Sequence, residues 1–165
     1  MSWLLDFMTQ GGPVLWAILL LCVVLWSLIL ERLWFYRISL PGSNRQLAER
    51  WRLRNEFQSW EARKIRAYWL SQQKQALEQY LPLIGILIAV CPLLGLLGTV
   101  RGMISVFDVL AITGTGNARA MANGISQATI PTMAGLVVAL TGLYFRTRFK
   151  RLSQRGLQQL ADSLE

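Results

Sequence analysis

Three long stretches without a charged residue constrain this 165-residue chain more than any other feature. They run from Phe7 to Leu30, from Leu81 to Val100 and from Ala120 to Phe145, which is 24, 20 and 26 residues. A helix rises about 1.5 Å per residue, so about 20 apolar residues cross a hydrocarbon core of roughly 30 Å. A buried helix of a soluble protein could explain one such stretch, but too little polar sequence remains to cover three. We therefore predict an all-α integral membrane protein with three transmembrane helices.

The first stretch is predicted to be a retained anchor rather than a cleaved signal peptide. It is longer than the apolar core of such peptides, which is about 7–15 residues, and no basic residue precedes it. Only Asp6 is charged before it, and Glu31 and Arg32 follow it directly.

The basic residues predict which side of the membrane each end of the chain occupies. Ten of the 17 Lys and Arg residues lie between Glu31 and Leu81, and five lie from Arg146 onward. Positive residues accumulate in cytoplasmic loops, so both segments are predicted to be cytoplasmic and the amino terminus periplasmic. The same charges can attract anionic lipid headgroups. Aromatic residues among them could bind nucleic acid, but the flanking membrane spans argue against nucleic acid as a partner.

Turn-forming residues divide the chain into segments. Gly-Gly-Pro at 11–13 predicts that the first helix begins there, since proline suits a first helical turn. Ser43 and Gln46 form a capping box that would open a cytoplasmic helix, and Asn117 would cap the last helix. The second and third spans are predicted to extend into the cytoplasm. The predicted segments are 1–36, a periplasmic terminus with the first span; 37–80, a cytoplasmic amphipathic helical region; 81–112, the second span; 113–117, a periplasmic turn; 118–146, the third span; and 147–165, a cytoplasmic helix.

Small residues recur at helical spacing in the second and third spans. Such faces let helix backbones approach closely in lipid, where burial from water no longer drives association. The simplest interpretation is packing within or between subunits. It predicts a homo-oligomer if the small faces exceed what one three-helix chain can bury. The predicted packing residues are Gly95, Gly98, Gly102, Ala128, Gly135, Ala139 and Gly142.

Hydroxyl and amide side chains supply polar groups within the spans. Thr99 lies about 25 Å beyond Pro82, and Thr132 lies about 20 Å before Phe145, so antiparallel helices would bring both threonines to similar depth. Their hydroxyls could equally just bond carbonyls of their own helices. The predicted lining of a proton pathway is Thr99, Thr132, Gln127 and Ser126.

No Asp, Glu, Lys or His lies at the middle of a span. Proton relays in membranes normally use such titratable groups, so a proton crossing here would need a carboxylate from a partner. Arg101 and Asp108, seven residues apart on one helical face, could pair as charges near the outer mouth. Pro92 and Pro131 could kink the second and third helices and free backbone carbonyls.

Catalytic and metal chemistry find no support in the sequence. There is no phosphate-binding loop, no histidine and no pair of carboxylates in a plausible cleft, so neither an enzyme nor a cofactor is predicted. Cys22 and Cys91 lie in separate apolar spans, which gives no basis for a metal site or a disulfide framework. The available energy source is the membrane potential, worth about 2.3 kcal/mol per elementary charge per 100 mV.

Four segments resemble the MotA/TolQ/ExbB proton channel family. The sequence PLLGLLGTVRGM at 92–103 is similar to the family's second-span signature, and GISQATIPTMAGL at 124–136 is similar to its third. GGPVLW at 11–16 and ERL at 31–33 resemble the flanks of its first span. Together these matches extend over nearly the whole chain apart from the cytoplasmic region.

The resemblance implies an ExbB-like subunit of a motor in the bacterial inner membrane, driven by the proton motive force. Members of the family form pentamers around a dimer of an ExbD-like partner, whose single transmembrane helix carries a proton-accepting aspartate. Proton flow then energises a TonB-type protein for uptake through outer-membrane receptors. Thr99 and Thr132 match threonines that line the family's inner pore.

One position and one segment differ from the usual pattern of the family. Many ExbB and TolQ members have glutamate where Gln127 stands, and Arg101 occupies a variable position. The short cytoplasmic segment and the sequence at 128–133 resemble the ExbB of secondary TonB systems.

The sequence leaves three alternative functions. A TolQ-like subunit would serve envelope integrity instead of uptake. A flagellar stator is disfavoured because the cytoplasmic region is small for a torque-generating surface. A non-conducting membrane scaffold would use the small faces for packing alone.

Overall fold

The computed structural model describes residues 2–39, 42, 47, 49, 60–114 and 118–163. All regular elements among these residues are helical, which confirms the all-α prediction. Three helical stretches, Gly11–Ile38, Trp60–Ile112 and Met121–Ser163, are long and apolar enough to cross a membrane. The elements are α1 (Ser2–Trp34), the π-helix η1 (Phe35–Ser39), α3 (Trp60–Glu78), α4 (Leu81–Thr113) and α5 (Ala118–Ser163).

Several predicted features lie outside the described residues. They are the capping box at Ser43 and Gln46, most of the predicted cytoplasmic helix before Trp60, and the cap at Asn117. The helices that are described form two compact units, and each unit is described by itself.

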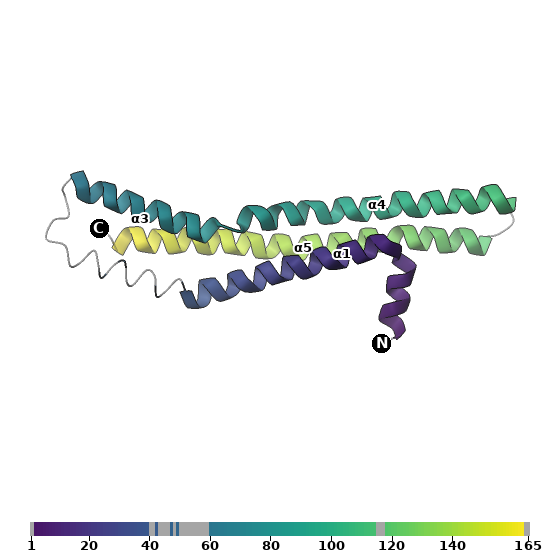
Figure 1. Ribbon diagram of the computed structural model, residues 1–165, viewed down its shortest axis with the longest axis horizontal. Coiled ribbons are helices and arrows are strands. Elements are labelled where there is room, and N and C mark those ends of the chain that lie inside the picture. The colour runs from purple at the N-terminus through teal and green to yellow at the C-terminus, as the bar shows by residue number, and fades with distance from the viewer. Residues whose placement is uncertain are drawn as a thin grey trace. The chain divides into compact units, whose positions relative to one another are not determined.

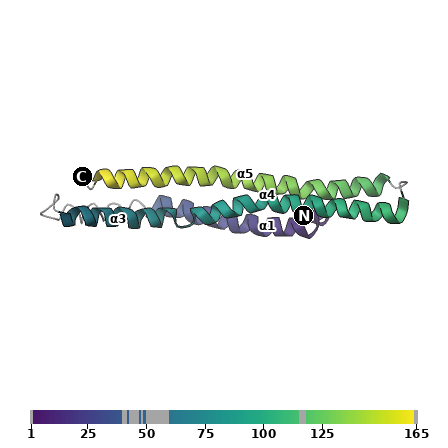
Figure 2. The ribbon, with the colours of Figure 1, turned by 90° about the horizontal axis from the view of Figure 1, so that it is seen from above.

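The first unit contains Met1–Trp26 and Gly85–Leu143. Within it α4 and α5 run antiparallel and side by side (Figures 1 and 2). α1 packs against them through side chains that include Leu15, Ile18 and Leu25, all at most 2% exposed. Large apolar side chains cover much of the outer surface, for example Leu20 and Leu140, which are 65% and 66% exposed. An apolar exterior suits hydrocarbon rather than water, in agreement with the three spans.

The start of α1 differs from the sequence prediction. The helix begins at Ser2, not near Gly11, and it is interrupted at Gly12, whose backbone is non-helical (φ 66°, ψ −167°). Figure 1 shows the segment before Gly12 turned away from the remainder of α1 in this unit. Glycine adopts a positive φ without the steric cost of a side chain, and Pro13 then suits a new first turn. The Gly-Gly-Pro signal therefore marks a break between two helical segments.

The two prolines that were predicted to kink helices lie inside helices that continue past them. Pro92 is within α4 and Pro131 is within α5. Pro131 is fully buried, and its side chain occupies the space beside Gly98 that a Cβ atom would otherwise fill. A glycine opposite the proline ring accommodates the bulk of the ring at the interface between the helices.

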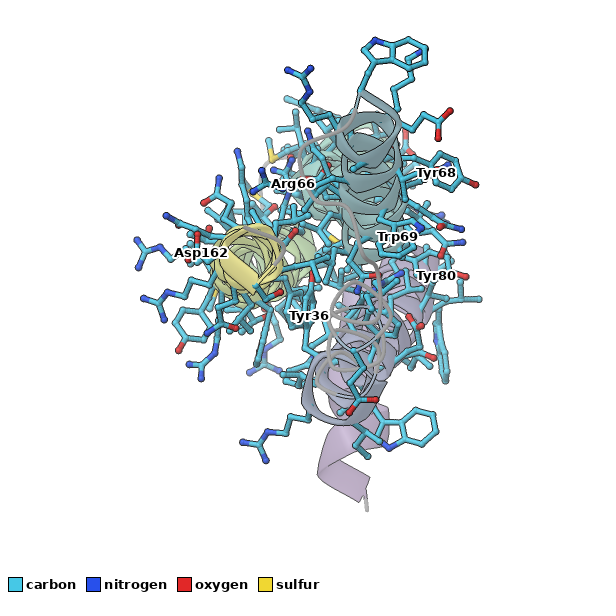
Figure 3. The ribbon with its side chains drawn as sticks, turned by 90° about the vertical axis from the view of Figure 1, so that its left-hand side faces the viewer. Tyr36, Arg66, Tyr68, Trp69, Tyr80 and Asp162 are labelled. Carbon is cyan, nitrogen blue, oxygen red and sulfur yellow. The ribbon has the colours of Figure 1, made fainter. Side chains whose placement is uncertain are left out.

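The second unit contains Ser27–Ile84 and Tyr144–Glu165. α3 packs on the carboxyl-terminal part of α5 through Ala62 and Leu160, which are 0% and 1% exposed. A guanidinium NH2 group of Arg66 donates a hydrogen bond of 2.8 Å to the carbonyl of Ala161. Figure 3 looks onto this unit and shows Arg66 on the side of α3 that faces α5, with Tyr68 pointing away.

A two-residue turn separates α3 from α4, and side chains of α1 and η1 cap it. The last carbonyls of a helix have no donor within the helix. Arg32 donates a 3.0 Å hydrogen bond to the carbonyl of Ala76, and the Tyr36 hydroxyl donates a 2.8 Å hydrogen bond to the carbonyl of Leu77. The end of the first span thereby supplies donors to the carboxyl end of α3.

Arg32 is 1% exposed, and its guanidinium group lies over two aromatic rings. Its guanidinium carbon lies 4.5 Å from the centre of the Tyr80 ring and 5.2 Å from that of Phe35. Its Nε lies 3.6 Å from a carboxylate oxygen of Glu31, an ion pair that is longer than a hydrogen bond. Cation–π attraction is strongest where the cation is removed from water, so this geometry stabilises a buried charge.

Candidate functional site

The interface between α4 and α5 contains the sequence signatures, and small residues set its spacing. A Cβ atom on Gly95 would lie 2.9 Å from the Cα of Thr132, and one on Gly102 would lie 2.6 Å from the Cα of Ala128. A Cβ on Gly135 would lie 2.5 Å from the carbonyl oxygen of Cys91. All of these distances are shorter than ordinary van der Waals contact with backbone atoms, so these positions admit glycine alone without a shift of the helices.

The remaining small positions pack inside the first unit as well. Gly98 faces Pro131 and Val14, and Gly142 faces Ile88 and Leu25. Ala128 and Ala139 are buried, at 4% and 8% exposure. The small residues therefore pack against other helices of the same chain. Their presence alone does not require that subunits associate.

The two threonines predicted to line a pathway both donate their hydroxyl protons to backbone carbonyls. Thr132 Oγ1 donates across the interface to the carbonyl of Gly95 at 3.0 Å. Thr99 Oγ1 donates to the carbonyl of Leu96 in its own helix at 2.7 Å. Since Thr132 lies opposite Gly95, it is about one helical turn from Thr99 along α4.

The hydrogen bonds define what these hydroxyls can do chemically. A hydroxyl has one proton to donate and two lone pairs that accept. With the proton engaged at a carbonyl, the oxygens of Thr99 and Thr132 remain acceptors. They can receive a hydrogen bond from water or from a protonated carboxylic acid, but they have no second proton to offer a carboxylate.

Ser126 and Gln127 are exposed on α5. The carbonyl of Ser126 accepts a 3.1 Å hydrogen bond from the hydroxyl of Thr129. Gln127 lines a pocket with Arg101 and Ser105 of α4, and neither Thr132 nor Gly95, whose carbonyl it bonds, lines this pocket. The structure therefore places Gln127 near Arg101 and does not bring all four predicted lining residues into one site.

Arg101 and Asp108 were predicted as a possible pair near the outer end of α4. Both side chains are described and exposed, and no ion pair joins them. Seven residues along a helix correspond to about 10.5 Å of rise, which is longer than these two side chains bridge when each extends into solvent. In the structure Arg101 lines the pocket with Gln127.

Two features of the molecule could not be found from sequence motifs. One is the pocket formed where Gly11–Val14 of α1 meets α4 and α5. The other is the buried Arg32, whose acceptor, the carbonyl of Ala76, is 44 residues away in the sequence. The Glu-Arg-Leu segment at 31–33 resembles only the flank of a span, and nothing local in it identifies an acceptor so far along the chain.

The fold defines a helical membrane protein with three candidate spans, and its α4–α5 interface carries hydroxyls but no titratable acid among the described residues. Comparison with known proteins gives the family. The model of the MotA/TolQ/ExbB proton channel family matches residues 42–162. The chain belongs to this family, as its second-span and third-span segments indicated.

Individual relatives agree with this assignment. The chain is 40% identical over 81 residues to biopolymer transport protein ExbB-like 3 of Synechocystis, a match that covers 48% of this chain and 39% of that protein. It is 33% identical over 97 residues to biopolymer transport protein exbB1 of Vibrio cholerae, covering 58% and 42%. It is 32% identical over 85 residues to the Tol-Pal system protein TolQ of Pseudomonas aeruginosa, covering 52% and 37%.

These matches cover about two fifths of the length of the relatives. No solved structure matches the chain. The comparisons therefore define the family, and they include both ExbB and TolQ proteins.

Proposed function

We propose that this chain is an ExbB-like subunit of a proton-driven motor in the bacterial inner membrane. In this proposal several copies, as in a pentamer, surround an ExbD-like partner and energise a TonB-type protein for uptake through outer-membrane receptors. The observation that carries the proposal is the family match over residues 42–162, with ExbB proteins among the relatives.

The membrane orientation is part of the proposal. The amino terminus would be periplasmic and the carboxyl terminus cytoplasmic. Arg146, Arg148, Lys150, Arg151 and Arg155 support this, since all five are exposed on α5 directly after its apolar run. Basic residues next to a span favour the cytoplasmic side. α3 and the end of α5 would then lie in the cytoplasm.

The proton step needs an acid from outside the chain. In the first unit, the only carboxylate among the described side chains is Asp108, which is nine residues from Thr99 along α4. A partner aspartate would therefore carry the proton. Thr99 and Thr132 would accept a hydrogen bond from that acid while it is protonated, because their own protons are engaged at carbonyls. This arrangement favours the neutral acid in the apolar interior, where a charge is costly.

Replacing both Thr99 and Thr132 by valine is expected to abolish proton flux and receptor-dependent uptake while the complex still assembles. Valine has the shape of threonine but offers no oxygen to the acid. Proton flux is measured in liposomes that contain the chain and its partner, and uptake is measured in cells. Thr141→Val is the matched control, since the Thr141 hydroxyl also bonds carbonyls within α5, at 2.8 and 3.2 Å. Full uptake by the double variant would contradict the role of the two threonines.

A TolQ-like role is the second candidate, and the similarity to a TolQ protein favours it. The two roles are separated by complementation. When this chain is expressed in a strain that lacks its own ExbB, receptor-dependent uptake is restored if the first role holds. When it is expressed in a strain that lacks TolQ, resistance to detergent is restored if the second role holds. A non-conducting scaffold predicts no proton flux in liposomes at any partner concentration.

A further inference from the structure

A polar pocket of about 180 Å³ lies in the first unit, where α1, α4 and α5 meet. It has room for several water molecules, each of which takes about 30 Å³ in the liquid, and so for a small polyatomic group. We propose that this pocket binds the phosphate group of a membrane phospholipid. The proposal does not depend on proton conduction. The lining residues are Gly11, Gly12, Pro13, Val14, Gly98, Arg101, Gly102, Ser105 and Gln127.

The side chains that line the pocket are suited to an anion. Arg101 carries the only charge, and Ser105 and Gln127 add a hydroxyl and an amide. None of the lining residues is acidic, and Arg101 forms no ion pair with a described carboxylate. Arginine presents planar donors that match phosphate oxygens, and a cation close to hydrocarbon is stabilised by a counter-charge.

The position of the pocket along each span fits the level of lipid headgroups. Arg101 is the first charged residue after the apolar run that begins at Leu81, which places it about 30 Å along α4. Gly12, where α1 is interrupted, is followed by 18 uncharged residues, Pro13 to Leu30, which is about 27 Å of helix. An apolar length of roughly 30 Å matches the hydrocarbon thickness, so a group held at Arg101 lies where phosphates lie.

Two observations favour a lipid over an acidic side chain of a partner helix. Thr99 does not line the pocket, and it is about 200° around α4 from Arg101, so a partner acid that is hydrogen-bonded to Thr99 would lie on the opposite side of α4 from Arg101. Leu93 and Leu97 precede Arg101 at intervals of four and share its face, and they are 64% and 54% exposed. This stripe offers a surface to an acyl chain, which a free phosphate ion does not have.

The test measures phospholipid binding to the delipidated full-length protein in detergent by native mass spectrometry, with phosphatidylglycerol as the probe. Arg101→Gln is expected to weaken binding about tenfold or more, since it removes the charge and the paired donors. Arg101→Lys keeps a point charge, so its affinity for the lipid should fall between that of the unmodified protein and that of Arg101→Gln. Arg119→Gln is the matched control, because Arg119 is also an exposed arginine of the first unit but does not line the pocket. Circular dichroism confirms that each variant retains its helix content.

Each other outcome would overturn the proposal. Equal loss in Arg101→Gln and Arg119→Gln would show general attraction of lipid to positive charge. Displacement of the lipid by millimolar inorganic phosphate, with equal thermal protection by phosphate alone, would identify a free anion as the ligand. Unchanged lipid binding in Arg101→Gln, together with loss of co-purification of the single-span partner, would identify an acidic side chain of that partner instead.

Discussion

Replacing Arg32 by methionine is expected to lower the free energy of unfolding by about 1.5–3 kcal/mol. Methionine fills a similar length of buried space, but it leaves the carbonyl of Ala76 without its 3.0 Å donor and removes the cation from between the rings of Phe35 and Tyr80. Hydrogen bonds from charged donors are worth more than neutral ones, and an unsatisfied buried carbonyl adds its own desolvation cost. The measurement is a titration with denaturing detergent, followed by circular dichroism.

Arg37→Met is the matched control for this substitution. Arg37 lies in η1, five residues after Arg32, but its side chain is exposed. Surface substitutions away from specific contacts usually change stability by less than about 0.5 kcal/mol. Arg32→Lys should be intermediate, since lysine keeps a donor but lacks the planar group that lies against the rings. If Arg32→Met were as stable as Arg37→Met, the capping role of Arg32 would be wrong.

Replacing Gly102 by valine is expected to separate α4 from α5 and to cost about 1–3 kcal/mol. The new Cβ would lie 2.6 Å from both the Cα and the Cβ of Ala128. Because one of these atoms belongs to the backbone of a helix, no side-chain rotation relieves the overlap. The gain in helix propensity on replacing glycine is only a few tenths of a kcal/mol and does not compensate.

The same detergent titration measures the effect of Gly102→Val. Ala89→Val is the control, because Ala89 is exposed on the same helix, so its replacement adds two methyl groups at the surface. The α4–α5 interface also holds the hydrogen bond from Thr132 to Gly95, so Gly102→Val should reduce proton flux as well as stability. Equal stability of the two variants would show that the helices can shift at little cost.

The small residues of α4 and α5 pack within one chain, which removes one reason to expect a homo-oligomer. From sequence, the small faces predicted a homo-oligomer if they exceeded what one three-helix chain can bury. In the structure Gly95, Gly102 and Gly135 are all occupied by contacts between α4 and α5. The proposed pentamer therefore rests on the family resemblance.

The sequence by itself determined the class of the protein and its helical content. Three uncharged runs of 20 to 26 residues are a local property, and their length is compared directly with the thickness of a bilayer. The segments 92–103 and 124–136 indicated the family, because a family signature is also a run of adjacent residues. Local signals of this kind need no knowledge of which helices meet.

Only the tertiary structure decided which residues meet. Thr132 bonds the carbonyl of Gly95, 37 residues away, and Arg32 bonds that of Ala76, 44 residues away. It also showed that Gly12 interrupts a helix already begun at Ser2, and that Arg101 lines a pocket with Gln127 and does not pair with Asp108. Helical periodicity predicts which face a side chain occupies, but the register between two helices is set by the fit of their surfaces, which no single helix contains.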